Sequence, residues 1–288
     1  MSALLILISG FTGIAEGVLV KRYNKIHAKG GFMFMSFISL FSMLFFVIKD
    51  IATDKSGFTL SLEILPYGVI AGILYCSASF LTYIALGCGP FAISMLILSY
   101  SGVFSVIYGL IFLSEPASVF TYIGFVLIVI SLYLTRAEKS KETKSISLKW
   151  IICMAISVFG SGMFGVLMRI QQIKFDYAYD NEFMAVLLAI SFVTLFTIGL
   201  ITNRGELSYT IRYGLPYGIG AGLSNGVTNT ISLILNTMMA ISISSPIRTA
   251  VKVILSFIFS SVIFKEKFLP RQVIGVILGG AALVFLNF

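Results

Sequence analysis

Charged residues are scarce in this chain. Of its 288 residues, 11% are Asp, Glu, Lys or Arg, whereas 58% are hydrophobic. A soluble globular domain carries about 25% charged residues, and a chain this apolar cannot cover its surface with polar groups. We therefore exclude a soluble fold and expect lipid to be the main solvent around the protein.

Histidine and cysteine are too few for the common catalytic and metal sites. The single histidine, His27, falls in a basic connection, and three cysteines lie far apart at positions 76, 88 and 153. This spacing does not suit a metal, and buried cysteines behave as small apolar residues. Intramembrane hydrolysis needs a Ser with a His, or paired aspartates, inside the spans. The sequence therefore predicts that the protein binds no cofactor and no metal and is not an enzyme.

Apolar runs alternate with short polar connections along the whole chain. Each run is close to the roughly 20 residues that a helix needs to cross a bilayer. The first run contains Glu16 and is not followed by a small-x-small cleavage pattern, so we expect it to stay in the mature protein. We predict an all-α, multi-pass protein of a cell membrane, such as a bacterial plasma membrane. Ten transmembrane helices are expected at 3–20, 31–48, 65–86, 91–113, 118–134, 150–168, 183–202, 213–235, 241–264 and 272–287.

The net charge of +8 is concentrated in the connections. This arrangement suits lipid headgroups and topology signals rather than nucleic acid. The connections that follow odd-numbered spans hold fourteen Lys and Arg residues, and the other connections hold four. The positive-inside rule therefore places the first set in the cytoplasm and both termini outside.

The chain repeats itself with a slowly drifting offset. The tetrapeptide Leu-Pro-Tyr-Gly at 65–68 recurs at 215–218, an offset of 150. Order-preserving repetition indicates a duplication, and five spans in each half force the second half to enter the membrane inverted. We predict a first five-helix repeat at 1–134, a basic linker at 135–149 and a second, inverted repeat at 150–288. Further matches are 34–35 with 183–184, 17–19 with 165–167, Glu115 with Glu266, and Gly124 with Gly275.

Several short motifs in the first repeat carry a family resemblance. They are Ala15-Glu16 followed by Lys21, Ala78-Ser79-Phe80, Tyr100-Ser101-Gly102, and Glu115-Pro116 with Gly124.

These motifs resemble the small multidrug resistance fold with one helix inserted after the first. Duplicated to ten spans, the whole chain resembles the EamA-type members of the drug/metabolite transporter superfamily. The resemblance implies transport of amino acids, sugars, related metabolites or drugs, often against protons. It implies that Glu16 binds proton and substrate and that Tyr100 contacts substrate. It also implies cytoplasmic termini, which disagrees with the distribution of basic residues.

Three ionisable residues inside the spans are candidates for function, because each is expensive to place in a bilayer, by about 2.5–3.5 kcal/mol or more. Glu16 lies in the first span and corresponds to Phe164 in the second repeat, so the carboxylate is single. Arg248 and Lys252 share a helix face at i, i+4. The alternatives are a Glu16 that pairs with Lys21, or a buried ion pair between Glu16 and one of the two bases.

Polar residues on two further spans extend this candidate site. Tyr75 and Ser79 share one helix face, and the repeat places Asn225 and Asn229 at the equivalent positions. Asparagine inside a span hydrogen-bonds either a neighbouring helix or a ligand. Trp150 is more simply an interfacial anchor.

The sequence favours a secondary transporter that moves a small polar metabolite by alternating access, with protons as the candidate coupling ion. One acid and two bases suit an anionic or zwitterionic substrate such as an amino acid. The alternative is an exporter of drugs or quaternary amines that uses Glu16 and an aromatic box of Tyr75, Tyr83 and Tyr100. The expected partners are a small-molecule substrate and the lipid bilayer; the oligomeric state is left open.

Overall fold

A computed structural model describes the protein at residues 2–27, 29–53, 61–112, 118–135, 147–202, 204–238, 241–266 and 268–285. Every regular element within these ranges is helical. Glu115 and Pro116, together with most of the linker predicted at 135–149, lie outside the described residues.

Within the described ranges, five helices are long and apolar enough to cross a bilayer. Large apolar side chains cover their outward faces; Leu4, for example, is 63% exposed and Ile48 is 64% exposed. Exposed apolar surface of this extent indicates contact with lipid, so the protein is a helical membrane protein, as predicted. The five are α1 (Ser2–Ile26), α2 (Gly31–Thr53), α3 (Leu65–Cys88), α7 (Leu148–Lys174) and α8 (Asp180–Thr202).

The remaining helices differ in detail from the predicted spans. The run expected at 91–113 forms two helices, because the chain makes tighter i to i−3 hydrogen bonds at Tyr100 and Ser101. The Leu-Pro-Tyr-Gly motif begins α3, but its copy lies inside a longer helix, α9, which contains Pro216. These elements are α4 (Phe91–Ser99), α5 (Gly102–Phe112), α6 (Val119–Thr135), the 3₁₀ turn η1 (Arg204–Glu206), α9 (Leu207–Met238), α10 (Ile241–Phe259), the π turn η2 (Ser260–Phe264) and α11 (Pro270–Phe285).

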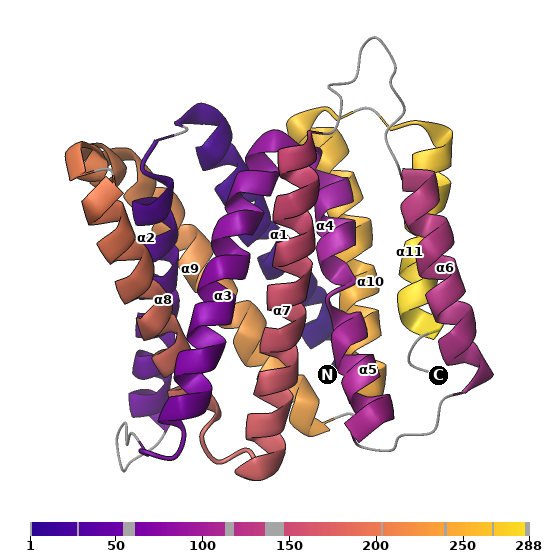
Figure 1. The fold of residues 1–288 in the computed structure, drawn as a ribbon, viewed down its shortest axis with the longest axis horizontal. Coiled ribbons are helices and arrows are strands. Elements are labelled where there is room, and N and C mark those ends of the chain that lie inside the picture. Colours follow the sequence, from indigo (N-terminus) through magenta and orange to yellow (C-terminus); the bar gives the residue numbers. More distant parts are fainter. Residues whose placement is uncertain are drawn as a thin grey trace.

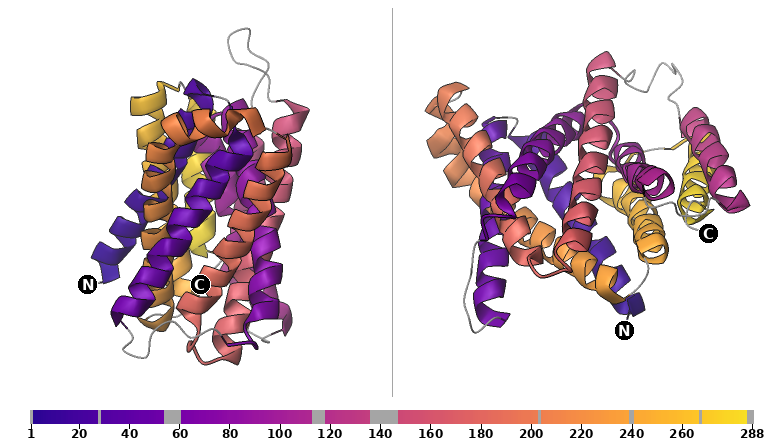
Figure 2. Two further views of the ribbon diagram at one scale, coloured as in Figure 1. Left: turned by 90° about the vertical axis from the view of Figure 1, so that its left-hand side faces the viewer. Right: turned by 60° about the horizontal axis from the view of Figure 1, so that its bottom comes forward.

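The helices form one bundle in which sequence-distant helices pack in pairs (Figures 1 and 2). At one edge α2 packs against α8 and α9, and at the other edge α6 packs against α11. Between them α1 contacts α9 and α10, α3 contacts α7 and α8, and α7 also contacts α4 and α5. The first residues of α1 and the last of α11 lie at the same end of the bundle.

Glycines allow two of these helix pairs to approach closely. A Cβ added to Gly72 of α3 would lie 2.8 Å from Ile190 Cβ and 2.9 Å from a backbone oxygen of α8. A Cβ added to Gly222 of α9 would lie 2.7 Å from Phe41 Cβ and 2.8 Å from a backbone oxygen of α2. Small residues of this kind drive helix association in a bilayer, because they bring backbones into van der Waals contact.

We predict that Gly72→Ala and Gly222→Ala each lower the free energy of unfolding in detergent by about 1–3 kcal/mol. The added methyl group meets backbone atoms that cannot rotate away, so the helices must separate. Gly280→Ala on α11 is the matched control, because a Cβ there meets nothing within 4 Å. The control should be neutral or stabilising; equal losses at all three positions would contradict this packing.

Candidate functional site

A chain of hydrogen bonds joins α1, α2 and α9 inside the bundle. Asn225 Nδ2 donates to both carboxylate oxygens of Glu16, at 3.0 and 3.1 Å. Asn225 Oδ1 accepts from the Ser42 hydroxyl at 2.7 Å and from Asn229 Nδ2 at 3.0 Å. Because two donors occupy its oxygen, the Asn225 amide is held with its NH₂ group toward Glu16. The structure therefore brings three of the predicted residues into one network.

Helix α3 adds Tyr75 and Ser79 to this cluster. The Tyr75 hydroxyl interacts electrostatically with Glu16 and lies beside Asn225 and Ser79. The Ser79 hydroxyl donates to the backbone oxygen of Tyr75 at 2.6 Å. The Tyr75 ring packs edge-on against Phe164, with 5.5 Å between ring centroids. The apolar residue that takes the place of Glu16 in the second repeat thus supports one wall of the cluster.

Helix α10 contributes both bases within its apolar stretch. The charges of Arg248 and Lys252 act on each other, and that of Lys252 also acts on Glu16. The Lys252 ammonium lies against α1, because a Cβ added to Gly13 would be 3.6 Å from Nζ. Lys252 and Glu16 form no ion pair within 4.0 Å, and Nζ has no hydrogen-bond acceptor among the described residues. An ammonium group in this position is suited to an anionic ligand.

Tyr100 lies away from this cluster, unlike the expectation from the family resemblance. It is 5% exposed, and its hydroxyl forms a 2.7 Å hydrogen bond with Ser131, which donates to a backbone oxygen of α11. Tyr83 packs against Phe34, with 6.0 Å between ring centroids. The structure therefore does not gather Tyr75, Tyr83 and Tyr100 into an aromatic box.

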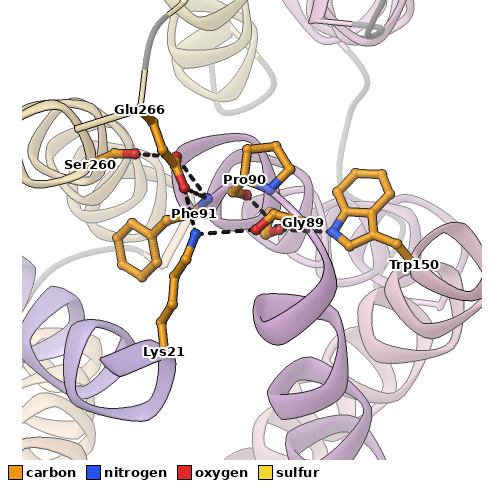
Figure 3. A network of polar contacts seen from close by, with 8 residues as sticks. Lys21, Gly89, Pro90, Phe91, Trp150, Ser260 and Glu266 are labelled. Atoms are coloured by element: carbon orange, nitrogen blue, oxygen red, sulfur yellow. Dashed lines mark hydrogen bonds and ion pairs between the residues drawn. The ribbon is translucent and has the colours of Figure 1, made fainter. Parts of the chain in front are cut away.

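Lys21 does not pair with Glu16, the alternative considered from the sequence. Its ammonium lies 2.5 Å from the Glu266 carboxylate, which also accepts the backbone N–H of Phe91 at 2.9 Å and the Ser260 hydroxyl (Figure 3). Glu266 thus satisfies the N-terminus of α4. This network joins α1, the start of α4, and Ser260 and Glu266 at and just after η2. Glu16 is hydrogen-bonded to Asn225 instead.

Trp150 is not an interfacial anchor, so that interpretation is wrong. The side chain is 4% exposed, and its indole N–H donates to the Ser94 hydroxyl at 3.1 Å. Burial against α4 supplies the hydrogen-bond partner that the membrane interface would otherwise supply.

Ser42 is a member of the site that the sequence analysis missed. It lies in α2, a helix from which no candidate was drawn. Ser36, Ser39 and Ser42 recur every third residue in an otherwise apolar helix, and all three are buried. This regular spacing of serines could have indicated Ser42 from the sequence, because hydroxyls inside a span tend to face a neighbouring helix.

The cysteines form neither disulfides nor a metal site in the described part of the chain. All three are free; Cys76 and Cys153 are buried and Cys88 is exposed. The described residues contain no group of three or more His, Cys, Asp or Glu that could hold a metal ion.

Comparisons with known proteins show the fold and no family. No family model and no curated protein matches the sequence. A crystal structure of a protein of unstated function superposes with a TM-score of 0.67 over 99% of this chain and 98% of its own length, at 12% identity. Identity this low shows a shared fold alone, so function must be argued from the site.

We predict that Ser42 and Glu16 are energetically coupled through Asn225. In a double-mutant cycle of Ser42→Ala and Glu16→Gln, the two changes in unfolding free energy should be non-additive by about 0.5–3 kcal/mol. The reason is that one amide orientation serves both partners. Chemical denaturation in detergent measures all four proteins.

Ser39→Ala supplies the control for this cycle. Ser39 is buried on the same helix, but its hydroxyl bonds Ser191 of α8 at 2.9 Å. Paired with Glu16→Gln it should give an additive result. Additivity in both cycles would show that Ser42 does not position the Asn225 amide.

Proposed function

We propose that this protein is a secondary transporter that moves a small anionic or zwitterionic metabolite, such as an amino acid, by alternating access. The observation that carries the proposal is the Lys252 ammonium. It lies within an apolar helix and has no hydrogen-bond acceptor among the described residues, and the carboxylate beside it is bonded to an amide instead of to this base. A carboxylate or phosphate would supply the missing acceptor.

The charges around the cluster favour a zwitterion or an anion over a simple cation. Two bases and one acid give a net charge of about +1 when all three are ionised. Glu16 can accept the amino group of a zwitterion, because Asn225 donates to the carboxylate from one side only. Arg248 and Lys252 can hold the carboxylate end of the same molecule.

The ten-span, inverted-repeat architecture is part of this proposal. Under the sequence offsets, α1 corresponds to α7, α2 to α8 and α3 to α9. The packing of α3 on α7 and α8 then has its counterpart in the packing of α9 on α1 and α2. The two glycine seams correspond in the same way, since Gly72 meets Ile190 and Gly222 meets Phe41. Two halves that exchange roles are the basis of alternating access.

The short motifs support placing the chain in the drug/metabolite transporter superfamily, and the shared fold of one crystal structure is compatible with that placement. The site does not support a quaternary-amine exporter, because Tyr75, Tyr83 and Tyr100 do not form an aromatic box.

We predict that Lys252→Met weakens the binding of the substrate about 10- to 100-fold, as expected for a hydrogen bond to a charged group. The substrate is first identified among amino acids, sugar phosphates and amines by the thermal stabilisation of the wild-type protein in detergent. Lys252→Arg keeps the charge and should retain part of the affinity.

Two results would contradict this assignment. If no anion or zwitterion stabilises the wild-type protein, the proposed substrate class is wrong. If Lys252→Met unfolds the protein and Glu16→Gln restores it, the two residues form a structural pair, because removing one partner of a buried pair is worse than removing both.

We also predict that Glu16→Gln abolishes proton-driven accumulation in proteoliposomes. A glutamine cannot release a proton, whereas exchange of substrate across the membrane needs only alternating access. Exchange should therefore be spared if Glu16 carries the coupling proton, and should fall with accumulation if Glu16 binds the substrate amino group. Unchanged proton-driven transport in this variant would remove Glu16 from the mechanism.

A further inference from the structure

Two connections distant in sequence form one surface at the end of the bundle opposite the termini (Figure 1). The His27 ring nitrogen Nδ1 and the Tyr209 hydroxyl are 2.8 Å apart, although 182 positions separate them. The backbone N–H of Gly30 donates to the Glu206 carboxylate at 2.5 Å. The α1–α2 and α8–α9 connections are therefore held together by side-chain contacts.

An aromatic ladder underlies this surface. Tyr209, Tyr213 and Tyr217 follow one another at i, i+4 and i+8 on α9, and His27 contacts all three rings. The His27 and Tyr213 rings are stacked, with 5.4 Å between their centroids. Tyr213 is 41% exposed. Tyrosines at the end of a membrane bundle favour the headgroup level, where one edge of the ring is apolar and the other is wet.

The same two connections carry exposed basic side chains, two of which lie over rings of the ladder. Between residues 21 and 31 and between 203 and 213 the sequence contains one acid, Glu206, which already accepts from Gly30. Lys29 lies over the Tyr209 ring and Arg212 over the Tyr213 ring. We call the exposed bases of these connections the basic end patch; they are Arg22, Lys25, Lys29, Arg204 and Arg212.

We propose that the basic end patch binds the phosphate groups of anionic phospholipids. The two connections supply one acid against these five bases, and the tyrosines set the patch at the depth of the headgroups. Each base near an anionic membrane surface strengthens binding about fivefold. Anionic lipids are enriched in the cytoplasmic leaflet, so this end of the bundle faces the cytoplasm and the termini lie on the other side.

The test compares lipids in mixed micelles of a neutral detergent. Dioleoyl phosphatidylglycerol should raise the melting temperature of the wild-type protein at lower concentration than dioleoyl phosphatidylcholine does. The double variant Lys25→Gln with Arg204→Gln should need about 25-fold more phosphatidylglycerol for the same shift. Neither residue contacts the aromatic ladder, so its melting temperature without lipid should be unchanged.

Arg169→Gln with Lys174→Gln is the matched control. It removes the same charge from bases near the end of α7, at the opposite end of the bundle, and it should keep the wild-type response. Equal stabilisation by the two lipids, or an equal loss in the control, would overturn the proposal. If glycerol 3-phosphate or inorganic phosphate alone stabilises the protein as much as phosphatidylglycerol does, the patch binds free phosphate rather than lipid, and the proposed occupant is wrong.

Discussion

A charge inside a membrane-spanning helix must be solvated by the protein itself, and the centre of this structure follows from that constraint. Glu16 receives both hydrogen bonds from one amide, and that amide is fixed by Ser42 and Asn229. The carboxylate is therefore bound without a base in contact with it. Lys252 stays close enough for its charge to act on Glu16, while Nζ has no acceptor in the part of the chain that the structure describes. Separated charges of this kind are what the proposed transport of a ligand with both signs requires.

The close helix contacts make this arrangement possible. Ser42 can reach Asn225 only because Gly222 and its neighbours let α9 approach the backbone of α2. The corresponding seam at Gly72 holds α3 against α8 and thereby sets the position of Tyr75. The Lys21–Glu266 network lies toward one end of the same helices and satisfies the start of α4. Because Lys21 pairs with Glu266, it does not act as a permanent counter-ion of the Glu16 carboxylate.

The distribution of charge at the two ends gives the bundle a polarity. Basic side chains from the α1–α2 and α8–α9 connections collect at one end, around an aromatic ladder that ties the connections together. A count of loop charge detects the bias but not the patch, because it treats each connection separately. The bases of the cluster are already part of the loop count, so the proposed lipid binding favours the orientation of that count over the one that the family resemblance implies.

The sequence by itself determined that the chain is a helical membrane protein and where most of its helices lie. Hydropathy and helix length are local properties, so runs such as 31–48 and 183–202 were found within a few residues. The sequence also identified Glu16, Asn225, Arg248 and Lys252, because a polar group inside an apolar run is costly wherever it faces. Only the tertiary structure decided the partners of those groups. In the structure Lys21 pairs with Glu266, and Ser42 joins the hydrogen-bond network of Asn225. Trp150 is buried, and the Tyr100 hydroxyl bonds Ser131. Each outcome depends on which helix face meets which neighbour, and that is set by packing between segments 31 to 245 residues apart, which no local pattern records.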